Sequence, residues 1–307
     1  MAKHVYGPVP SRRLGFSLGV DLVPPKTCTM SCVYCQLGLT PRATVARASY
    51  SPVDEVVEDV RAALERGPKP DSVTLGGSGE PTLHSAFGEI AQHIRKFAPC
   101  PIALLTNGTL FYLPEVRAAC SAIDIILPTL DAGDQETFER IHRPHPDITL
   151  EKLVQGLAAL REEFHGQIWL EVFLVPGLNM SDKQVQQLRT RIARVRPDKV
   201  QLNTAVRPPA ESSVRAATVE EMEKVRAALG TNAEVIAEPP AARLAASGEV
   251  REQDVLNMLS RRPCTAEDVS AGLGINPNEV NKCLRGLLDG GKVLELRKGK
   301  KVFYRTR

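Results

Sequence analysis

Short apolar, β-branched runs alternate with amphipathic stretches over the first 235 or so residues of the chain. Such runs are typical of buried strands, and apolar residues three and four positions apart are typical of helices that cover a sheet. The expected strands are 16–23, 72–75, 102–106, 123–128, 167–175 and 199–203, and the expected helices are 52–65, 84–97, 113–120, 135–141, 150–164, 182–195 and 219–228. Strands that alternate with helices in this way indicate βαβ units, so the pattern predicts an α/β fold with six repeats around a parallel sheet.

Capping residues support two of the expected helix starts. Ser181 is followed three positions later by Gln184, and Thr218 is followed in the same way by Glu221. This spacing is that of a capping box, in which each side chain satisfies a free backbone N–H at the start of the helix. We therefore expect helices to begin directly after Ser181 and Thr218.

The hydrophobic pattern changes after a Pro- and Ala-rich stretch at 238–248, which is expected to be a linker. Three short helices are expected at 250–260, 265–271 and 277–288, followed by strands at 292–296 and 301–304. Three helices followed by a two-stranded hairpin are typical of a winged helix-turn-helix domain. The chain is therefore divided into a large α/β domain at 1–237, the linker at 238–248 and a small domain at 249–307.

Composition restricts the class of protein. Hydrophobic residues make up 43% and charged residues 24% of the chain, as in ordinary globular proteins. No apolar run approaches the ~18 residues that a membrane span needs, and residues 1–13 lack the pattern of a signal peptide. We therefore expect a cytoplasmic protein with no membrane partner.

The net charge of +3 is distributed unevenly. Residues 250–307 contain twelve Lys or Arg and seven Asp or Glu, which gives a net charge of +5. Residues 1–249 contain 27 Lys or Arg and 29 Asp or Glu, which gives a net charge of −2. The basic character therefore belongs to the C-terminal segment, where it is concentrated in the expected hairpin at 292–307.

Three of the seven cysteines lie within eight residues, Cys28, Cys32 and Cys35, directly after the first expected strand. The spacing CxxxCxxC does not resemble a disulfide framework, and it allows three thiolates in one loop to bind three irons of a single [4Fe–4S] cluster. The fourth iron then remains open for the amino and carboxylate groups of S-adenosylmethionine (SAM). The alternatives are three buried thiols, or a zinc site that lacks a nearby fourth ligand. Cys100, Cys120, Cys264 and Cys283 are scattered and are interpreted as core or surface thiols.

Because of the spacing of these cysteines and their position after the first expected strand, residues 16–240 resemble the radical SAM superfamily. The resemblance implies an incomplete (βα)6 barrel, similar to a TIM barrel that lacks two units. It also implies a [4Fe–4S] cluster held by Cys28, Cys32 and Cys35, SAM as the second cofactor, and an electron donor such as flavodoxin or ferredoxin. The implied reaction is reductive cleavage of SAM to a 5′-deoxyadenosyl radical, which abstracts hydrogen from a substrate.

Further segments match the superfamily pattern in order. Tyr34 lies where members carry an aromatic residue beside the adenine. The stretch Gly76-Gly77-Ser78-Gly79-Glu80-Pro81 resembles the Gly-Gly-Glu-Pro motif that holds the SAM amino group, with a departure of one residue. An ordinary strand–helix turn is the alternative for this loop.

The ends of the later strands supply the other expected contacts with SAM. Barrel active sites lie at the carboxyl ends of the strands. These positions carry Thr106 with Asn107, and Thr129 with Asp131. Glu171 and Asn203 point from the late strands, where they can bind SAM or substrate or be satisfied within the barrel. Arg143 is expected either to pair with the SAM carboxylate or to be a solvated loop residue.

The opening segment, residues 7–15, contains Arg12 and Arg13 ahead of the first expected strand. These arginines are expected to meet a phosphate-bearing substrate or to cover the open side of the barrel. The segment resembles a subgroup of radical SAM proteins related to the wybutosine pathway. Enzymes that make 4-demethylwyosine need cysteines for a second cluster, and the scattered cysteines do not provide that set.

The favoured substrate is RNA, with tRNA as the favoured kind, delivered by the winged helix. A peptide or protein substrate is the main alternative, since winged helices also bind peptides and proteins, and a purely structural appendage is a third. An iron–sulfur regulator that binds DNA is the alternative from another class. Such a regulator would need the cluster but would release no 5′-deoxyadenosine.

Overall fold

The computed structural model describes residues 4–66, 68–230, 232–236 and 251–307. Its larger part is an eight-stranded sheet in chain order, in which β1 pairs antiparallel with β2 and every later neighbour is parallel. The strands are β1 (Val5–Ser11), β2 (Gly15–Val20), β3 (Ser72–Leu75), β4 (Ile102–Leu105), β5 (Ile125–Leu127), β6 (Gln167–Leu174), β7 (Lys199–Thr204) and β8 (Ala233–Val235). The six expected parallel strands correspond to β2–β7 and are confirmed.

Two strands were not expected from the sequence. Strand β1 contains Pro8 and Pro10, which cannot donate to a ladder and are tolerated at the edge of a sheet. Strand β8 has three residues, too few for a hydrophobic pattern to be recognised. Together they extend the sheet by one strand on each side of the predicted six.

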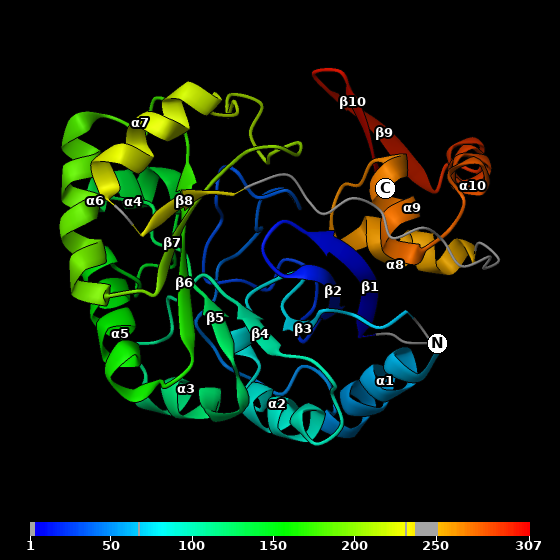
Figure 1. The fold of residues 1–307 in the computed structure, drawn as a ribbon, viewed down its shortest axis with the longest axis horizontal. Helices are drawn as coiled ribbons and strands as arrows, with labels where there is room; N and C mark the ends of the chain where they lie inside the picture. Colours follow the sequence, from blue (N-terminus) through cyan, green and yellow to red (C-terminus); the bar gives the residue numbers. More distant parts are fainter. Residues whose placement is uncertain (1–3, 67, 231, 237–250) are drawn as a thin grey trace.

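The helices lie on the outer side of the curved sheet (Figure 1). They are α1 (Val53–Arg66), α2 (Phe87–Arg95), α3 (Pro114–Ala118), α4 (Gln135–His142), α5 (Leu150–Glu163), α6 (Asp182–Val195) and α7 (Val219–Leu229), with the short 3-10 helices η1 (Pro81–Leu83) and η2 (Ala119–Ala122). The capping box of Thr218 and Glu221 is confirmed. At α6 only half of the expected box forms, because the Gln184 side chain bonds Gly133 N and Asp134 instead of returning to Ser181.

The core lies between the sheet and these helices, while the inner side of the sheet is only partly apolar. Side chains alternate along a strand, so Ile102 and Leu104 of β4 pack in the core and Ala103 packs on the inner side with Leu14 and Leu127. Other inward positions are polar, among them the buried residues Ser17, Thr74, Gln201 and Asn203. The inner side therefore has room for a polar cavity.

The C-terminal unit consists of α8 (Glu252–Arg261), α9 (Ala266–Leu273), α10 (Pro277–Asp289), β9 (Val293–Lys298) and β10 (Lys301–Thr306). The expected order of three helices and a hairpin is therefore observed, and the expected linker at 238–248 lies outside the described residues. Val9 of β1 belongs to the hydrophobic cluster of this unit, and a Cβ on Gly272 would lie 2.6 Å from Pro8 O. The unit is thus packed against β1 (Figure 1).

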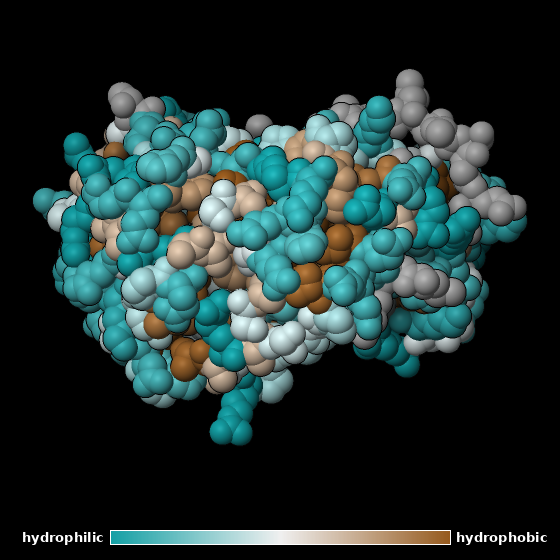
Figure 2. Space-filling model, turned by 90° about the horizontal axis from the view of Figure 1, so that it is seen from below, coloured by the Kyte–Doolittle hydropathy of each residue, from teal (hydrophilic) through white to brown (hydrophobic). Residues whose placement is uncertain are grey.

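Figure 2 shows one face of the molecule, on which hydrophilic side chains predominate and hydrophobic ones form small groups. Among the described residues, the large hydrophobic side chains that are exposed are Leu39, Val206 and Val219, which is an ordinary number for a globular protein. Over the same residues we find no helix with the length and apolar character that crossing a membrane requires.

Candidate active site

The three clustered cysteines lie in the loop that joins β2 to α1. Cys28, Cys32 and Cys35 are unpaired, partly exposed, and line one cavity of about 350 Å³, which is within the range of about 300–1,000 Å³ typical of small-molecule sites. The loop is held to the end of α4 by Ser31 N, which donates to His142 O (2.8 Å), and by Val33 N, which donates to Ile141 O (2.9 Å). The elements that follow in the chain therefore fix the positions of the thiols.

The electrostatics of these thiols suit a polynuclear metal cluster. Burial, and then the nearby carboxyl of Glu80, raise the pKa of Cys28 to about 12, and burial and the other two sulfurs raise the pKa of Cys32 well above its usual value. In their thiolate forms these groups would need a compensating cation, which a bound iron–sulfur cluster would supply. Within the described ranges no three Cys, His, Asp or Glu side chains converge on a single metal ion.

Each of the three sulfurs has a polar neighbour. Lys26 Nζ donates to Cys35 Sγ (3.2 Å), Asn107 Nδ2 lies 3.6 Å from Cys28 Sγ, and His142 Nδ1 lies 3.1 Å from Cys32 Sγ. Hydrogen bonds to the sulfurs are among the factors that set the reduction potential of an iron–sulfur cluster.

Lys26 and His142 were not predicted from the sequence, where no histidine was expected near the cysteines. Lys26 could have been suspected from its position two residues before Cys28. His142 lies 110 residues from Cys32, and only the packing of α4 against the loop brings the two together.

The glycine-rich loop after β3 runs against the cysteine loop. A Cβ on Gly79 would lie 2.1 Å from Thr27 O, and one on Gly77 would lie 2.8 Å from Asp21 Cγ, so both positions need glycine. Gly77 and Gly79 line the cavity. Gly76 and Ser78 lie outside that lining, and Ser78 Oγ donates to Asp21 (2.5 Å).

Glu80 is a buried carboxylate in the cavity wall, with 2% of its surface exposed. Its Oε1 accepts from Thr82 N (3.1 Å), Thr82 Oγ1 (2.6 Å) and Thr106 Oγ1 (2.6 Å), whereas its Oε2 accepts from Asn107 N (2.8 Å). Burial raises the pKa of Glu80 in spite of these hydrogen bonds. The carboxylate ties the loops after β3 and β4 together, and its Oε2 keeps capacity for a further donor.

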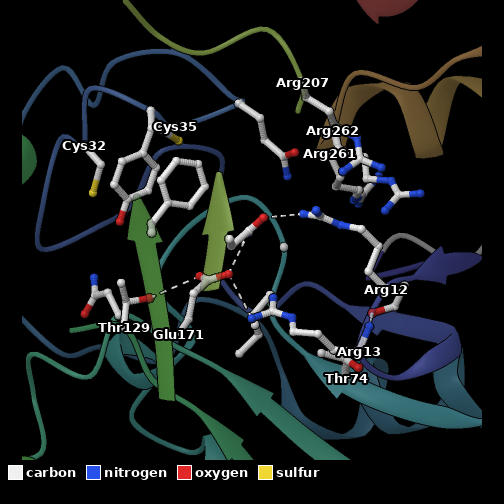
Figure 3. A pocket seen from close by; sticks show the side chains of 18 of the residues that line it. Arg12, Arg13, Cys32, Cys35, Thr74, Thr129, Glu171, Arg207, Arg261 and Arg262 are labelled. Carbon is white, nitrogen blue, oxygen red and sulfur yellow. Dashed lines mark hydrogen bonds and ion pairs between the residues drawn. The ribbon is translucent and has the colours of Figure 1, made fainter. Parts of the chain in front are cut away.

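Glu171 and Asn203 meet on the cavity wall, together with Thr129. Asn203 Nδ2 donates to Glu171 Oε1 (2.8 Å), and Thr129 Oγ1 lies 3.5 Å from Glu171 Oε2. Arg13 Nη1 pairs with Glu171 Oε1 (2.9 Å), and Arg12 Nη2 donates to Asn203 Oδ1 (2.6 Å) (Figure 3). Strands β6 and β7 and the loop after β5 are thereby connected to the turn between β1 and β2.

Tyr34 also lines the cavity, where its ring stacks on Phe173 with 3.8 Å between centroids. Its hydroxyl donates to Asp131 Oδ2 (2.9 Å), and Asp131 Oδ1 lies 2.5 Å from His142 Nε2. Asp131 is 1% exposed and lies outside the cavity lining. Arg143 also lies outside the lining and is ion-paired with Glu211.

Comparisons with known proteins agree with this geometry. The family model described as the radical SAM superfamily matches residues 22–188. A protein named "GTPase Obg" of Brachyspira hyodysenteriae is 36% identical over 296 residues, and the match covers 95% of this chain but 44% of that relative. The chain thus spans less than half of that relative's length. A UPF0026 protein of Helicobacter pylori is 32% identical over 98% of this chain and 96% of its own. A solved structure of a radical SAM methyltransferase from Sphaerobacter thermophilus shares the fold, with a TM-score of 0.55 at 20% identity over 71% of this chain and 65% of that one.

Proposed function

The chain belongs to the radical SAM superfamily, and from this premise we propose that it modifies RNA held between the barrel and the C-terminal unit. It is a radical SAM enzyme, and its cofactors are a [4Fe–4S] cluster and SAM. When bound, these cofactors supply a 5′-deoxyadenosyl radical that removes a hydrogen atom from the substrate, after an electron from a donor such as flavodoxin or ferredoxin has entered the cluster.

We assign the three thiols of Cys28, Cys32 and Cys35 to the cluster. Their common loop and their common position in the cavity wall support this assignment. Lys26 donates to one of these sulfurs and Asn107 lies beside another, so this chain holds polar groups ready at the cluster.

The predicted SAM-binding residues divide into two groups. Those in the cavity wall are proposed to contact SAM: Tyr34, Gly77, Gly79, Glu80, Thr106, Asn107, Thr129, Glu171 and Asn203. Glu80 Oε2 is proposed to accept from the SAM amino group, because it has one donor in the protein and Oε1 has three. Gly76, Ser78 and Asp131 are proposed to position these residues, since they adjoin the lining without belonging to it. Arg143 is exposed and ion-paired with Glu211, so it is not proposed to contact SAM.

We propose that the C-terminal unit, residues 249–307, is a winged helix-turn-helix domain that brings RNA to the barrel of residues 1–237. The observation that carries this proposal is that one cavity is lined both by the three cysteines and by Arg261 and Arg262 at the end of α8. The same unit presents Lys300 and Lys301 as exposed cations on the β9–β10 hairpin. The sequence of segment 7–15 supports our proposal that the chain belongs to the subgroup of radical SAM proteins related to the wybutosine pathway.

One residue of the hairpin has a different role from the one that its charge suggested. Lys298 Nζ donates to Ala205 O (2.5 Å) and Arg207 O (2.9 Å), and burial lowers its pKa. Lys298 therefore fastens the hairpin to the loop after β7. Lys300 and Lys301 are the better positions for testing RNA contacts.

The experiment is release of 5′-deoxyadenosine by the anaerobically reconstituted, reduced protein, with and without total cellular RNA. Release that rises when RNA is added supports an RNA substrate. Slow release that RNA leaves unchanged contradicts it and directs the search to peptides and proteins. An intact cluster with no release contradicts turnover and favours a DNA-binding regulator.

A further inference from the structure

Five arginines line the cavity across from the cysteines. Arg12 and Arg13 come from the turn between β1 and β2, Arg207 from the loop after β7, and Arg261 and Arg262 from the end of α8. Figure 3 shows Arg12, Arg207, Arg261 and Arg262 gathered on one side of the pocket, with Cys32 and Cys35 on the other. Three separate parts of the chain therefore place guanidinium groups on one wall.

Carboxylates compensate only part of this charge. Arg13 pairs with Glu171 (2.9 Å), and the ion pairs of Arg207 and Arg261 are with Asp268 (3.6 Å) and Asp21 (3.3 Å). Three of the five arginines are therefore balanced by a carboxylate of the protein.

Neither Arg12 nor Arg262 forms an ion pair with a carboxylate among the residues that the structure describes. Against the effect of burial, however, the nearby charges of Cys264 and Asp268 raise the pKa of Arg262. Arg12 donates to the neutral amide of Asn203. Arg262 has Pro10 O at 3.5 Å from both terminal nitrogens, and its Nε is buried without a hydrogen-bond partner in the described part of the chain. A buried donor without a partner is costly, so this nitrogen indicates a group that the protein itself does not supply.

The crowding of like charges leads to the same conclusion. Burial lowers the pKa of Arg12 to about 10, and the neighbouring charges of Arg207, Arg13 and Arg262 act in the same direction. Burial followed by the charge of Arg262 lowers the pKa of Arg207 as well. An anion bound among these groups would offset their mutual repulsion.

We infer that Arg12 and Arg262 bind a phosphate group of the RNA substrate in the cavity. Arginine presents a planar fork of donors that matches the oxygens of a phosphate, and two arginines from separate elements can hold one phosphate from two sides. The inference rests on the RNA-modifying function proposed above. It names the part of the substrate that is recognised next to the reaction centre, and it makes the C-terminal unit part of the substrate site.

The test compares the reconstituted wild-type protein with the double variant Arg12→Gln, Arg262→Gln. The matched control is Arg66→Gln, Arg189→Gln, which removes the same charge from two exposed helical positions. Binding of inorganic pyrophosphate is measured by calorimetry, binding of bulk tRNA by fluorescence anisotropy over a range of salt, and binding of SAM separately. Thermal unfolding shows whether the variants are folded. A further double variant, Arg12→Lys, Arg262→Lys, retains both positive charges but lacks the planar donor geometry of the guanidinium groups.

The expected result is a decrease in pyrophosphate affinity of about 100-fold or more in the Arg12/Arg262 variant, since two arginines are removed and each charged hydrogen bond contributes at least about a tenfold factor. The lysine variant should lie between that variant and the wild type, and the control should match the wild type. We also expect the tRNA salt slope to fall by about 0.7–0.9 for each phosphate that is no longer neutralised.

Two results would overturn the inference. One is pyrophosphate affinity equal to that of the control, and the other is a parallel decrease in SAM affinity, which would assign the arginines to the SAM carboxylate. Failure of the wild-type protein to bind tRNA would instead overturn the proposed RNA substrate. The pyrophosphate measurement does not depend on RNA, so the two failures are distinguishable.

Discussion

Replacement of Gly79 by alanine tests whether the glycine-rich loop and the cysteine loop form one rigid site. The added Cβ would lie 2.1 Å from Thr27 O and 2.8 Å from Val23 Cγ2. A tolerable contact needs about 3.0 Å, so the two backbones must separate by about 1 Å, and overpacking of this kind costs about 1–3 kcal/mol. Thr27 directly precedes Cys28, and Glu80 N also donates to Thr27 O (2.9 Å). The shift therefore reaches a cluster ligand and the proposed SAM contact together.

We expect Gly79→Ala to lower the free energy of unfolding by about 1–3 kcal/mol. We also expect it to slow 5′-deoxyadenosine release by about 100-fold, since a displacement of about 1 Å costs that much in a preorganised site. Denaturant unfolding and anaerobic product release measure the two effects. The control is Gly286→Ala in α10, where a Cβ meets nothing within 4 Å and helix propensity favours alanine by up to about 1 kcal/mol. Wild-type stability and release rate in Gly79→Ala would refute the reasoning.

Three further predictions concern the cluster and the hairpin. Cys32→Ala should abolish bound iron and sulfide and the release of 5′-deoxyadenosine while the C-terminal unit stays folded; retained cleavage would contradict the cluster assignment. Lys26→Met should lower the midpoint potential of the cluster, because the cationic side chain donates to Cys35 Sγ and stabilises the reduced cluster. The expected decrease is on the order of 50 mV, which is close to a tenfold change in the equilibrium for one electron. An unchanged potential in an EPR-monitored titration would contradict this. Lys300→Gln with Lys301→Gln should weaken tRNA binding and reduce its salt slope by about 0.7–0.9 for each phosphate that the hairpin no longer neutralises, and an unchanged slope would remove the hairpin from the RNA surface.

Much of the fold was predictable because its signals are local. Each strand of the parallel set is a short apolar run, and α5–α7 each have a helical period and a capping side chain. Strands β2–β7 and helices α5–α7 therefore follow from short windows of the sequence. Strand β1 was not predictable in this way. Its prolines argue against a strand, and what makes it one is its pairing with β2 and its packing under α9.

The candidate site shows the same division. The spacing of Cys28, Cys32 and Cys35 places three thiols in one loop in almost any fold, so the cluster could be predicted from the sequence. Lys298 carries a positive charge in a basic hairpin, and the sequence suggested a contact with nucleic acid. Its two carbonyl acceptors lie 93 and 91 residues away, and only the docking of the hairpin against the loop after β7 reveals that role.

The sequence by itself therefore determined the superfamily chemistry: the cysteine triplet, the glycine-rich loop and the repeating βα pattern are short-range features. The tertiary structure decided which side chains face that chemistry. Arg12 contacts Asn203 across 191 residues because the sheet curves until the β1–β2 turn faces β7 (Figure 1), and Arg262 reaches Pro10 across 252 because the C-terminal unit packs on β1. Such contacts depend on register and docking, which result from the burial of the whole core and are not encoded in the neighbourhood of any single residue.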